Sequence, residues 1–181
     1  MKRVIFLMFD NVEELEAIAP IDYLKRANAD VRLASLCSDV KVRGRSGIEI
    51  TCDSLFSDEI YKDFDMVVVP GGPGTNSVLK NDAVLEFIAR QYKRGAIIGA
   101  ICAAPVVLKM AGILDGKKCT AHTSRRDELE NCSDSKAVVI DGNIVTSQGA
   151  GTAIEFALDL VEKLFSKEIS KEIAISTCYM R

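Results

Sequence analysis

Four short segments of the chain have the pattern of strands that are buried on both faces. Each is four to six residues long and mainly apolar. Such runs are typical of parallel strands that are covered by helices on both sides of a sheet. The four segments are residues 4–9, 31–36, 65–69 and 97–100.

Segments with helical periodicity separate these strands. The first predicted helix covers residues 13–28, and Pro20 is expected to kink or break it. The apolar positions of this segment, which recur about once per turn, are Leu15, Ile18, Ile21 and Leu24. Further helices are predicted for residues 82–94, 103–110, 152–165 and 167–176.

Turn signals add two hairpins to the pattern. Asp141-Gly142-Asn143 lies between two short apolar runs, which is a strong signal for a tight hairpin. Residues 42–52, interrupted by two glycines, predict a short irregular hairpin. Residues 112–118 are predicted to turn, and residues 119–122 to form a short extended piece.

The alternation of strands and helices predicts an α/β fold. We expect a three-layer sandwich in which a mostly parallel, twisted sheet carries helices on both faces. The length of 181 residues is that of one domain, residues 1–181. Sites in such folds lie at the carboxyl ends of the strands. This rule brings the following parts to one rim of the sheet: residues 10–16, residues 70–74, Cys102 and residues 147–151.

The composition narrows the classes of function. The net charge is −3 and the isoelectric point about 5.3, without a dense Lys/Arg cluster, so nucleic acid is not an expected partner. No run approaches the ~20 apolar residues of a membrane span, and residues 4–9 are too short a run for a signal peptide. The six cysteines are scattered along the chain, which favours reduced thiols in a cytoplasmic protein.

Cys102 is the strongest candidate for chemistry, because it stands between a predicted strand and a predicted helix. Ala100 and Ala104 flank it with the spacing of a nucleophile elbow, where a sharp turn needs small neighbours. The N-terminus of the following helix is expected to favour the thiolate. A lone cysteine in an apolar run is more often a buried residue that fills space, but the elbow spacing favours the nucleophile.

Other chemical motifs are weaker. Cys119, His122 and Cys132 could be written as zinc ligands, but the chain has one histidine and the spacing fits no common site. Gly149 and Gly151 stand before a predicted helix, as in a dinucleotide loop, but the third glycine of that motif is missing. We therefore expect neither a metal nor an organic cofactor, and leave open an anion contact at that helix N-terminus.

Four parts of the chain together resemble the ThiJ/PfpI superfamily, and the likeness runs from about Arg3 into the last predicted helix. The first two are Gly99-Ala-Ile-Cys102-Ala-Ala-Pro105, similar to its cysteine elbow, and Val68-Val-Pro-Gly-Gly72, similar to its oxyanion-side glycine loop. The other two are Glu13-Glu-Leu-Glu16 with Pro20-Ile-Asp22, and Thr146-Ser-Gln-Gly-Ala-Gly-Thr152 with Glu155-Phe-Ala-Leu158. The resemblance implies a flavodoxin-like fold of the class I glutamine amidotransferase type.

Within the superfamily the chain most resembles the Parkinson-disease-associated protein deglycases and their microbial relatives. The protease branch carries a histidine directly after the cysteine, where this chain has Ala103. Class I glutamine amidotransferases carry a late His-x-Glu pair, whereas the single histidine here is His122. Animal members of the resembling branch have glycine at the position of Ala104, and its methyl group is expected to narrow the pocket slightly.

The resemblance assigns roles to the candidate residues. Cys102 is the nucleophile, and Glu16 reaches its thiol from the first helix. Two contacting anions repel each other, so the pair is expected to share one proton, with Glu16 neutral. The backbone at Gly71, Gly72 and Ala103 is expected to bind an oxyanion or the substrate.

His122 is implied as a second catalytic group, although a lone histidine in a loop more often has a surface or hydrogen-bonding role. The acidic residues near the start of the first helix have an alternative role as well. Acids there usually interact with the helix dipole, and of Glu13, Glu14 and Glu16 two are expected to do only that.

The implied function is that of a cofactor-independent enzyme acting on reactive dicarbonyls such as methylglyoxal, or on glycated groups. This glutathione-independent glyoxalase or deglycase would be a homodimer in which Cys102 adds to the aldehyde and Glu16 moves a proton between adjacent carbons. A second hypothesis is an oxidative-stress sensor or redox-regulated chaperone, in which Cys102 is oxidised to the sulfinic acid. A third, a thiol peptidase, is disfavoured by Ala103. The first two use the same residues, so the sequence leaves both open.

Overall fold

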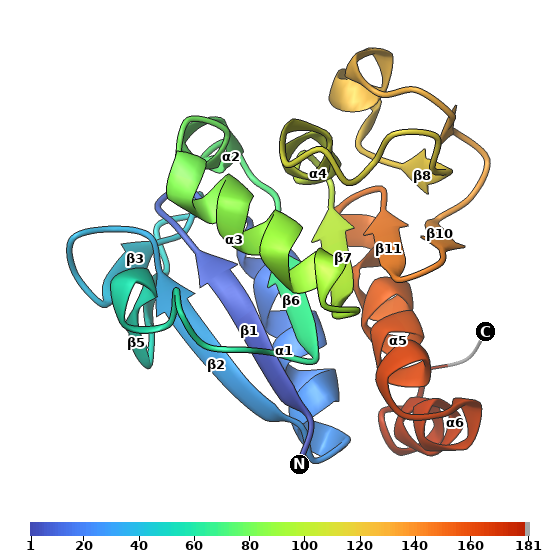
Figure 1. The fold of residues 1–181 in the computed structure, drawn as a ribbon. Coiled ribbons are helices and arrows are strands. Elements are labelled where there is room, and N and C mark those ends of the chain that lie inside the picture. The colour runs from blue at the N-terminus through green and yellow to red at the C-terminus, as the bar shows by residue number, and fades with distance from the viewer. Residues whose placement is uncertain (180–181) are drawn as a thin grey trace.

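A seven-stranded sheet runs through the middle of the computed structural model, which describes residues 1–179 (Figure 1). All neighbouring strands in it are parallel except the β10–β11 hairpin. The spatial order is β10 (Val138–Asp141), β11 (Ile144–Ser147), β7 (Ile97–Ile101), β6 (Met66–Val69), β1 (Arg3–Met8), β2 (Asp30–Ser35) and β5 (Ser54–Leu55).

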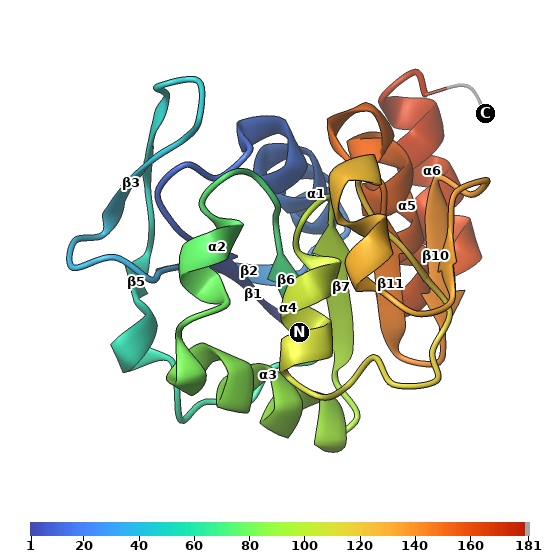
Figure 2. The same ribbon diagram turned by 90° about the horizontal axis from the view of Figure 1, so that it is seen from above.

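Helices cover both faces of this sheet, as the view from above shows (Figure 2). One face carries α1 (Glu14–Arg26), α5 (Ala153–Leu164) and α6 (Lys167–Ser176). The other carries α2 (Thr75–Val78), α3 (Asp82–Lys93) and α4 (Pro105–Met110). Short 3₁₀ turns lie at Phe56–Asp58, Thr123–Glu128 and Ala150–Thr152. No helix within residues 1–179 is long and apolar enough to cross a membrane.

The predicted α/β fold with a mostly parallel sheet and helices on both faces is confirmed. The four apolar runs correspond to β1, β2, β6 and β7, and every residue of β6 and β7 is buried. The strand order reverses between β1 and β6, because β2 and β5 follow on one side and β7 and β11 on the other. The crevice at the carboxyl ends of β1 and β6 is therefore where such a fold binds ligands.

Two small sheets stand outside the main one. The predicted irregular hairpin is β3 (Lys41–Arg43) with β4 (Glu49–Thr51), paired antiparallel. The extended piece after the turn region is β8 (Cys119–Thr120), which pairs in parallel with β9 (Cys132–Ser133). The pattern did not predict the two-residue strands β5 and β9 or the short helix α2, because each is too short to show a periodicity.

Helix α1 differs from its prediction in two ways. It runs unbroken through Pro20, which is buried. Its apolar stripe was also misplaced: Leu15 and Ile18 are 50% and 46% exposed. An α-helix turns by about 100° per residue, so residues spaced by three move steadily to another side of the helix. Leu15 and Leu24, nine residues apart, therefore point about 180° away from each other around the helix axis. The face that packs on the sheet instead contains Ala17, Pro20, Ile21 and Leu24.

Candidate active site

Cys102 stands on a sharp, strained turn at the end of β7. Its φ is 66°, in the left-handed region that non-glycine residues rarely adopt. Hydrogen bonds fix the turn: the Cys102 N–H donates to the Ser147 carbonyl (2.9 Å), and the Cys102 carbonyl accepts from the His122 N–H (2.9 Å). Ala100 and Ala104 are fully buried beside it. The structure thus has the elbow backbone that the small neighbours predict, and the strain is held by pairing on both sides.

Ala104 does not narrow the pocket, contrary to the sequence-based expectation. Its side chain is fully buried beneath the turn and is not among the residues that line the cavity. The following helix also starts later than predicted, at Pro105 and not at residue 103.

Glu16 reaches the elbow from the first turn of α1 and is 1% exposed. Its Oε2 accepts a hydrogen bond from the Gly71 N–H (3.0 Å), and its carboxyl group lies beside the Cys102 thiol, near enough for each to shift the pKa of the other. A Cβ at Gly71 would lie 2.5 Å from that Oε2 and 2.6 Å from the Cys102 Cβ. Only glycine therefore lets β6, α1 and the elbow approach this closely.

Burial governs the ionisation of the two side chains. It raises the pKa of Glu16 to about 7, against the opposing hydrogen bonds from Cys102 and Gly71. It also raises the pKa of Cys102 to about 12, and the neighbouring Glu16 carboxylate acts in the same direction. The thiolate that the N-terminus of the following helix was expected to favour is thus opposed by burial and by Glu16, which together raise this pKa. Both shifts favour the protonated forms, so the thiol keeps its proton at neutral pH and the predicted combination of a thiolate with a neutral Glu16 is not the resting state.

The backbone N–H groups around the site interact with two different side chains, the Glu16 carboxyl group and the Cys102 sulfur. The Gly71 N–H is engaged by Glu16, whereas the N–H groups of Gly72 and Ala103 point at the Cys102 sulfur and lower its pKa. Gly72 has a φ of +110°, and a Cβ there would lie 2.5 Å from the Asn11 carbonyl oxygen. Gly72 and Ala103, and not Gly71, are thus the donors available to an oxygen that is bound at the sulfur.

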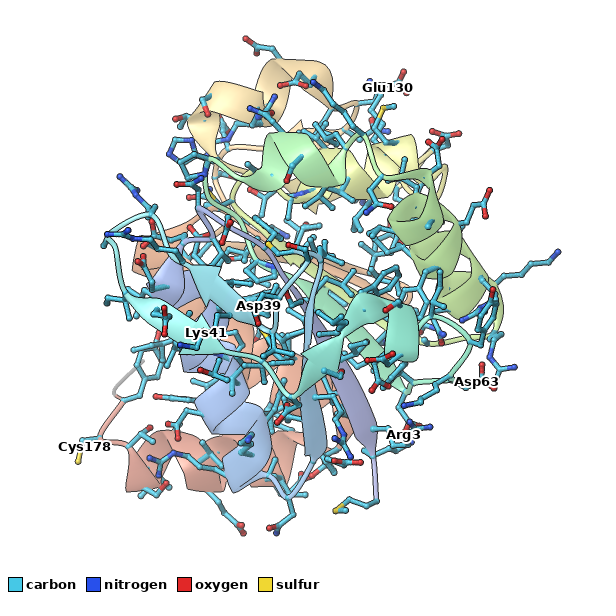
Figure 3. All side chains as sticks on the ribbon, turned by 90° about the vertical axis from the view of Figure 1, so that its left-hand side faces the viewer. Arg3, Asp39, Lys41, Asp63, Glu130 and Cys178 are labelled. Atoms are coloured by element: carbon cyan, nitrogen blue, oxygen red, sulfur yellow. The ribbon has the colours of Figure 1, made fainter. Side chains whose placement is uncertain are left out.

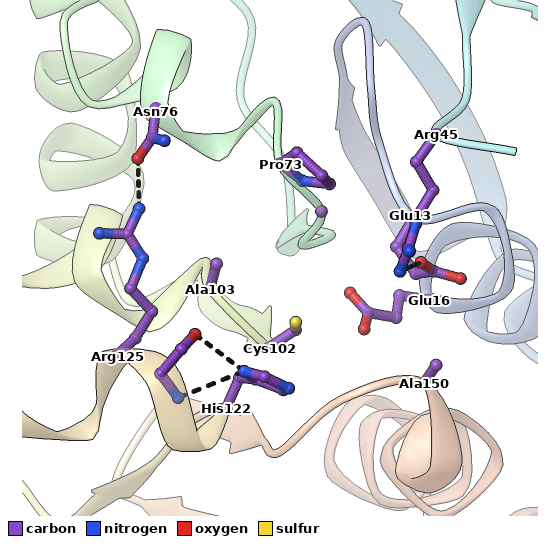
Figure 4. Close-up of a pocket in the computed structure, with 12 residues that line it drawn as sticks. Glu13, Glu16, Arg45, Pro73, Asn76, Cys102, Ala103, His122, Arg125 and Ala150 are labelled. Carbon is purple, nitrogen blue, oxygen red and sulfur yellow. Dashed lines mark hydrogen bonds and ion pairs between the residues drawn. The ribbon is translucent and has the colours of Figure 1, made fainter.

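His122 follows β8 and lies beside Cys102 at the mouth of the pocket (Figure 4). Its Nδ1 accepts from the Ser124 N–H (3.3 Å) and lies 2.9 Å from the Ser124 Oγ. Because Nδ1 uses its lone pair as an acceptor, the neutral ring carries its proton on Nε2. Nε2–H is then the donor left for a ligand.

The pocket above the sulfur has a volume of about 490 Å³. It brings together the two predicted residues Glu16 and His122 with two arginines that the sequence analysis missed. Arg45 pairs with Glu13 (2.9 Å), and Arg125 pairs with Glu128 (2.7 Å) and Asn76. The complete lining is Glu13, Glu16, Arg45, Gly72, Pro73, Asn76, Cys102, Ala103, His122, Ser124, Arg125 and Ala150.

Most, but not all, of the segments predicted to meet at one edge of the sheet line the pocket. Residues 10–16, residues 70–74 and Cys102 all contribute, but of residues 147–151 only Ala150 lines the cavity. A Cβ at Gly149 would lie 3.6 Å from the His122 ring and 3.8 Å from Glu16. Arg45 and Arg125 could have been suspected only from their places near Gly44 and His122, since charged loop residues are usually solvated.

The residues considered as zinc ligands do not converge. Cys119 and Cys132 are paired in the small β8–β9 sheet, whereas His122 faces the pocket. Among residues 1–179 no group of three His, Cys, Asp or Glu side chains is placed to hold a metal ion.

The raised pKa of Glu16 predicts a loss of stability with increasing pH. The ordinary pKa of 4.5 becomes about 7 in the folded protein, so between these values the folded protein keeps a proton that the unfolded chain loses. The free energy of unfolding should fall by about 3 kcal/mol across this window. Glu16→Gln has no proton to lose, so its decline between pH 5 and pH 8 should be smaller. Urea unfolding at both pH values measures this, and parallel profiles would contradict the assignment.

Comparison with known proteins gives consistent matches. Residues 2–163 match the model of the DJ-1/PfpI family. The chain is 37% identical over 177 residues to Protein dj-1beta of Drosophila melanogaster, covering 96% of this chain and 95% of that protein. It is 34% identical to the glutathione-independent glyoxalase DJR-1.2 of Caenorhabditis elegans (97% and 95% covered) and 30% identical to Deglycase PfpI of Pyrococcus furiosus (90% and 99%). The solved structure of oxidised Toxoplasma gondii DJ-1 superposes with a TM-score of 0.96 at 34% identity, covering 100% of both chains.

Proposed function

This chain belongs to the DJ-1/PfpI family, and from that premise we propose that it is a cofactor-independent enzyme of the glyoxalase or deglycase type. Its substrates are reactive dicarbonyls such as methylglyoxal, or glycated groups. The observation that carries the proposal is a buried Glu16 carboxyl, with a pKa of about 7, beside the thiol of a strained elbow cysteine. Relatives named glyoxalase and deglycase support the same activity.

In the first step the Cys102 sulfur adds to the aldehyde carbon. The Glu16 carboxylate accepts the thiol proton, because it is the base beside the sulfur. The aldehyde oxygen becomes an oxyanion next to the Gly72 and Ala103 N–H groups and is then protonated to give a hemithioacetal.

In the second step Glu16 works as a proton shuttle. Its carboxylate removes the hydrogen from the former aldehyde carbon, which gives an enediol, and returns a proton to the adjacent carbon. A pKa close to ambient pH suits both directions of this transfer. In this proposal His122 Nε2–H stabilises the charge on the second oxygen. The product is a thioester on Cys102, and water then releases the 2-hydroxy acid and restores the thiol.

An isotope experiment tests this route. Methylglyoxal is converted by the reduced protein in D₂O, and the deuterium at C2 of lactate is measured by NMR. Because the carboxyl proton of Glu16 exchanges with solvent, we expect lactate that carries deuterium at C2. Lactate with only protium at C2 would indicate a direct hydride shift and contradict the shuttle. Absence of lactate would contradict the proposed activity itself.

A second candidate function rests on the same acid. At neutral pH a protonated Glu16 can donate a hydrogen bond to a sulfinate on Cys102, which favours a redox sensor or redox-regulated chaperone. Two peroxide molecules would supply the two oxygen atoms. The oxidised state of the Toxoplasma gondii structure supports this alternative.

We also propose a cytoplasmic homodimer. Exposed apolar side chains lie on α1 and on the β3–β4 hairpin that is tied to it: Leu15 and Ile18 on the helix, and Ile48 (57% exposed) on the hairpin. Glu14 makes that tie by accepting from the Ser46 N–H (2.7 Å). All six cysteines are free thiols, which supports a reducing compartment. Sedimentation velocity of the wild type and of Leu15→Arg tests the dimer, which the charge should weaken.

A further inference from the structure

Two cysteines that the proposed reaction does not use face each other in the small β8–β9 sheet. Cys119 and Cys132 are direct partners in its parallel register, so their side chains project from the same face. Residues paired in this way lie about 4.8 Å apart, within the ~4.4–6.8 Å between Cα atoms that disulfides span. The nearby Cys132 is one of the causes that raise the pKa of Cys119, which shows that the two thiols are close enough to interact. The pair is therefore placed to be bridged without rearranging the strands.

The two thiols have different surroundings. Cys119 is fully buried, with its Sγ 3.7 Å from the Glu130 carbonyl oxygen. Cys132 is half-buried and lines a cavity of about 330 Å³ together with Lys118 and Lys136. Burial raises the pKa of Cys119 to about 12. Cys132 is thus the thiol that meets an oxidant first.

We propose that Cys119 and Cys132 form a reversible disulfide when the protein meets a peroxide. Peroxide oxidises Cys132 to a sulfenic acid and is itself reduced to water or an alcohol. The Cys119 sulfur gives up its proton and attacks the Cys132 sulfur, and hydroxide leaves as water. In total the two thiols lose two hydrogen atoms, and the peroxide accepts them.

The bridge would close the segment that carries one side of the active-site pocket. His122, Ser124 and Arg125 all lie between the two cysteines and line that pocket. The Cys119 end is anchored, because the Thr120 N–H donates to the Thr146 Oγ1 (2.9 Å) and its hydroxyl to the Ser133 carbonyl (2.7 Å). The oxidised protein should therefore hold this segment near its present position.

Peptide mapping tests the proposal in protein carrying Cys102→Ser, which removes oxidation at the elbow. After hydrogen peroxide, blocking of free thiols and tryptic digestion without reductant, residues 119–125 should be linked to residues 127–136. The mass of the linked species should be lower than the summed masses of the two reduced peptides by two hydrogen atoms. Treatment with dithiothreitol should abolish the linked species. Tm should rise by up to about 10 °C on oxidation, because the crosslink restricts the unfolded chain.

Matched variants identify the partners. Cys132→Ser should abolish the linked species, whereas Cys178→Ser should keep it, since Cys178 and Glu130 lie at opposite ends of the molecule (Figure 3). If Cys119 stays alkylatable while Cys132 proceeds to the sulfinic acid, the proposal is wrong. It is equally wrong if the linked peptides join different molecules. Neither result bears on turnover by Cys102, so this test and that of the proposed activity fail independently.

Discussion

Glu16→Gln is expected to lower the turnover of methylglyoxal by about 10²- to 10⁴-fold, the usual contribution of a general base. The amide keeps a hydrogen-bond donor and nearly the same volume beside the Cys102 sulfur, but it cannot accept the carbon-bound proton. Kinetics at saturating methylglyoxal, followed by lactate formation, measure the loss. Glu172→Gln makes the same chemical change on an exposed position of α6 and should leave turnover unchanged.

Two further measurements on the same variant separate the proposed functions. Covalent addition of the aldehyde should survive, because the Cys102 sulfur and the Gly72 N–H remain, so intact mass after trapping should still show an adduct. Oxidation of Cys102 to the sulfinic acid should also survive, since the amide donates to the oxidised sulfur. Unchanged turnover in Glu16→Gln would remove the proton shuttle from the mechanism.

Gly71→Ala is expected to lower turnover about as much as Glu16→Gln does, because it displaces Glu16 from Cys102 without removing any catalytic group. The added methyl group would meet the Glu16 Oε2, the Cys102 Cβ and the Ile101 carbonyl oxygen at 2.5, 2.6 and 2.8 Å. One of these contacts is backbone, so the loop must shift and Glu16 must leave the Gly71 N–H. We expect a loss of at least about 10²-fold in kcat and about 1–3 kcal/mol of stability.

Gly151→Ala is the matched control for this substitution. A Cβ there meets nothing within 4 Å, and the backbone is not in the left-handed region. Its stability should therefore be close to that of the wild type. If Gly71→Ala retained full turnover, the close approach of Glu16 to Cys102 would not be required for the chemistry.

Much of the fold follows from local patterns. Buried parallel strands are continuous apolar runs, which is why β1, β2, β6 and β7 could be predicted as segments. The elbow could be predicted too, because a sharp turn at Cys102 has room only for small side chains on both sides of it. The order of the strands then brings Glu16 and the Gly71 loop to the cysteine, by a general rule about parallel sheets.

The remaining features depend on contacts between distant parts of the chain. Leu15 and Ile18 are apolar and recur with helical spacing, but they lie on the exposed side of α1 and not on the side that packs against the core. The raised pKa of Cys102 results from its burial and from Glu16, and an isolated strand–helix turn carries neither cause. The engagement of the Gly71 N–H by Glu16, like the convergence of Arg45 and Arg125 on one pocket, joins loops far apart in sequence.

The central claim is that Cys102 is the nucleophile of a cofactor-independent reaction. The most direct test compares lactate formation from methylglyoxal by reduced wild type and by Cys102→Ser, in buffer free of thiols and metal ions. A hydroxyl group in that position is a far weaker nucleophile than the thiol, so the variant should show only the background rate. We predict turnover by the wild type and none above background by the variant. Wild-type turnover no higher than that of Cys102→Ser would contradict the account and leave the redox sensor as the better explanation.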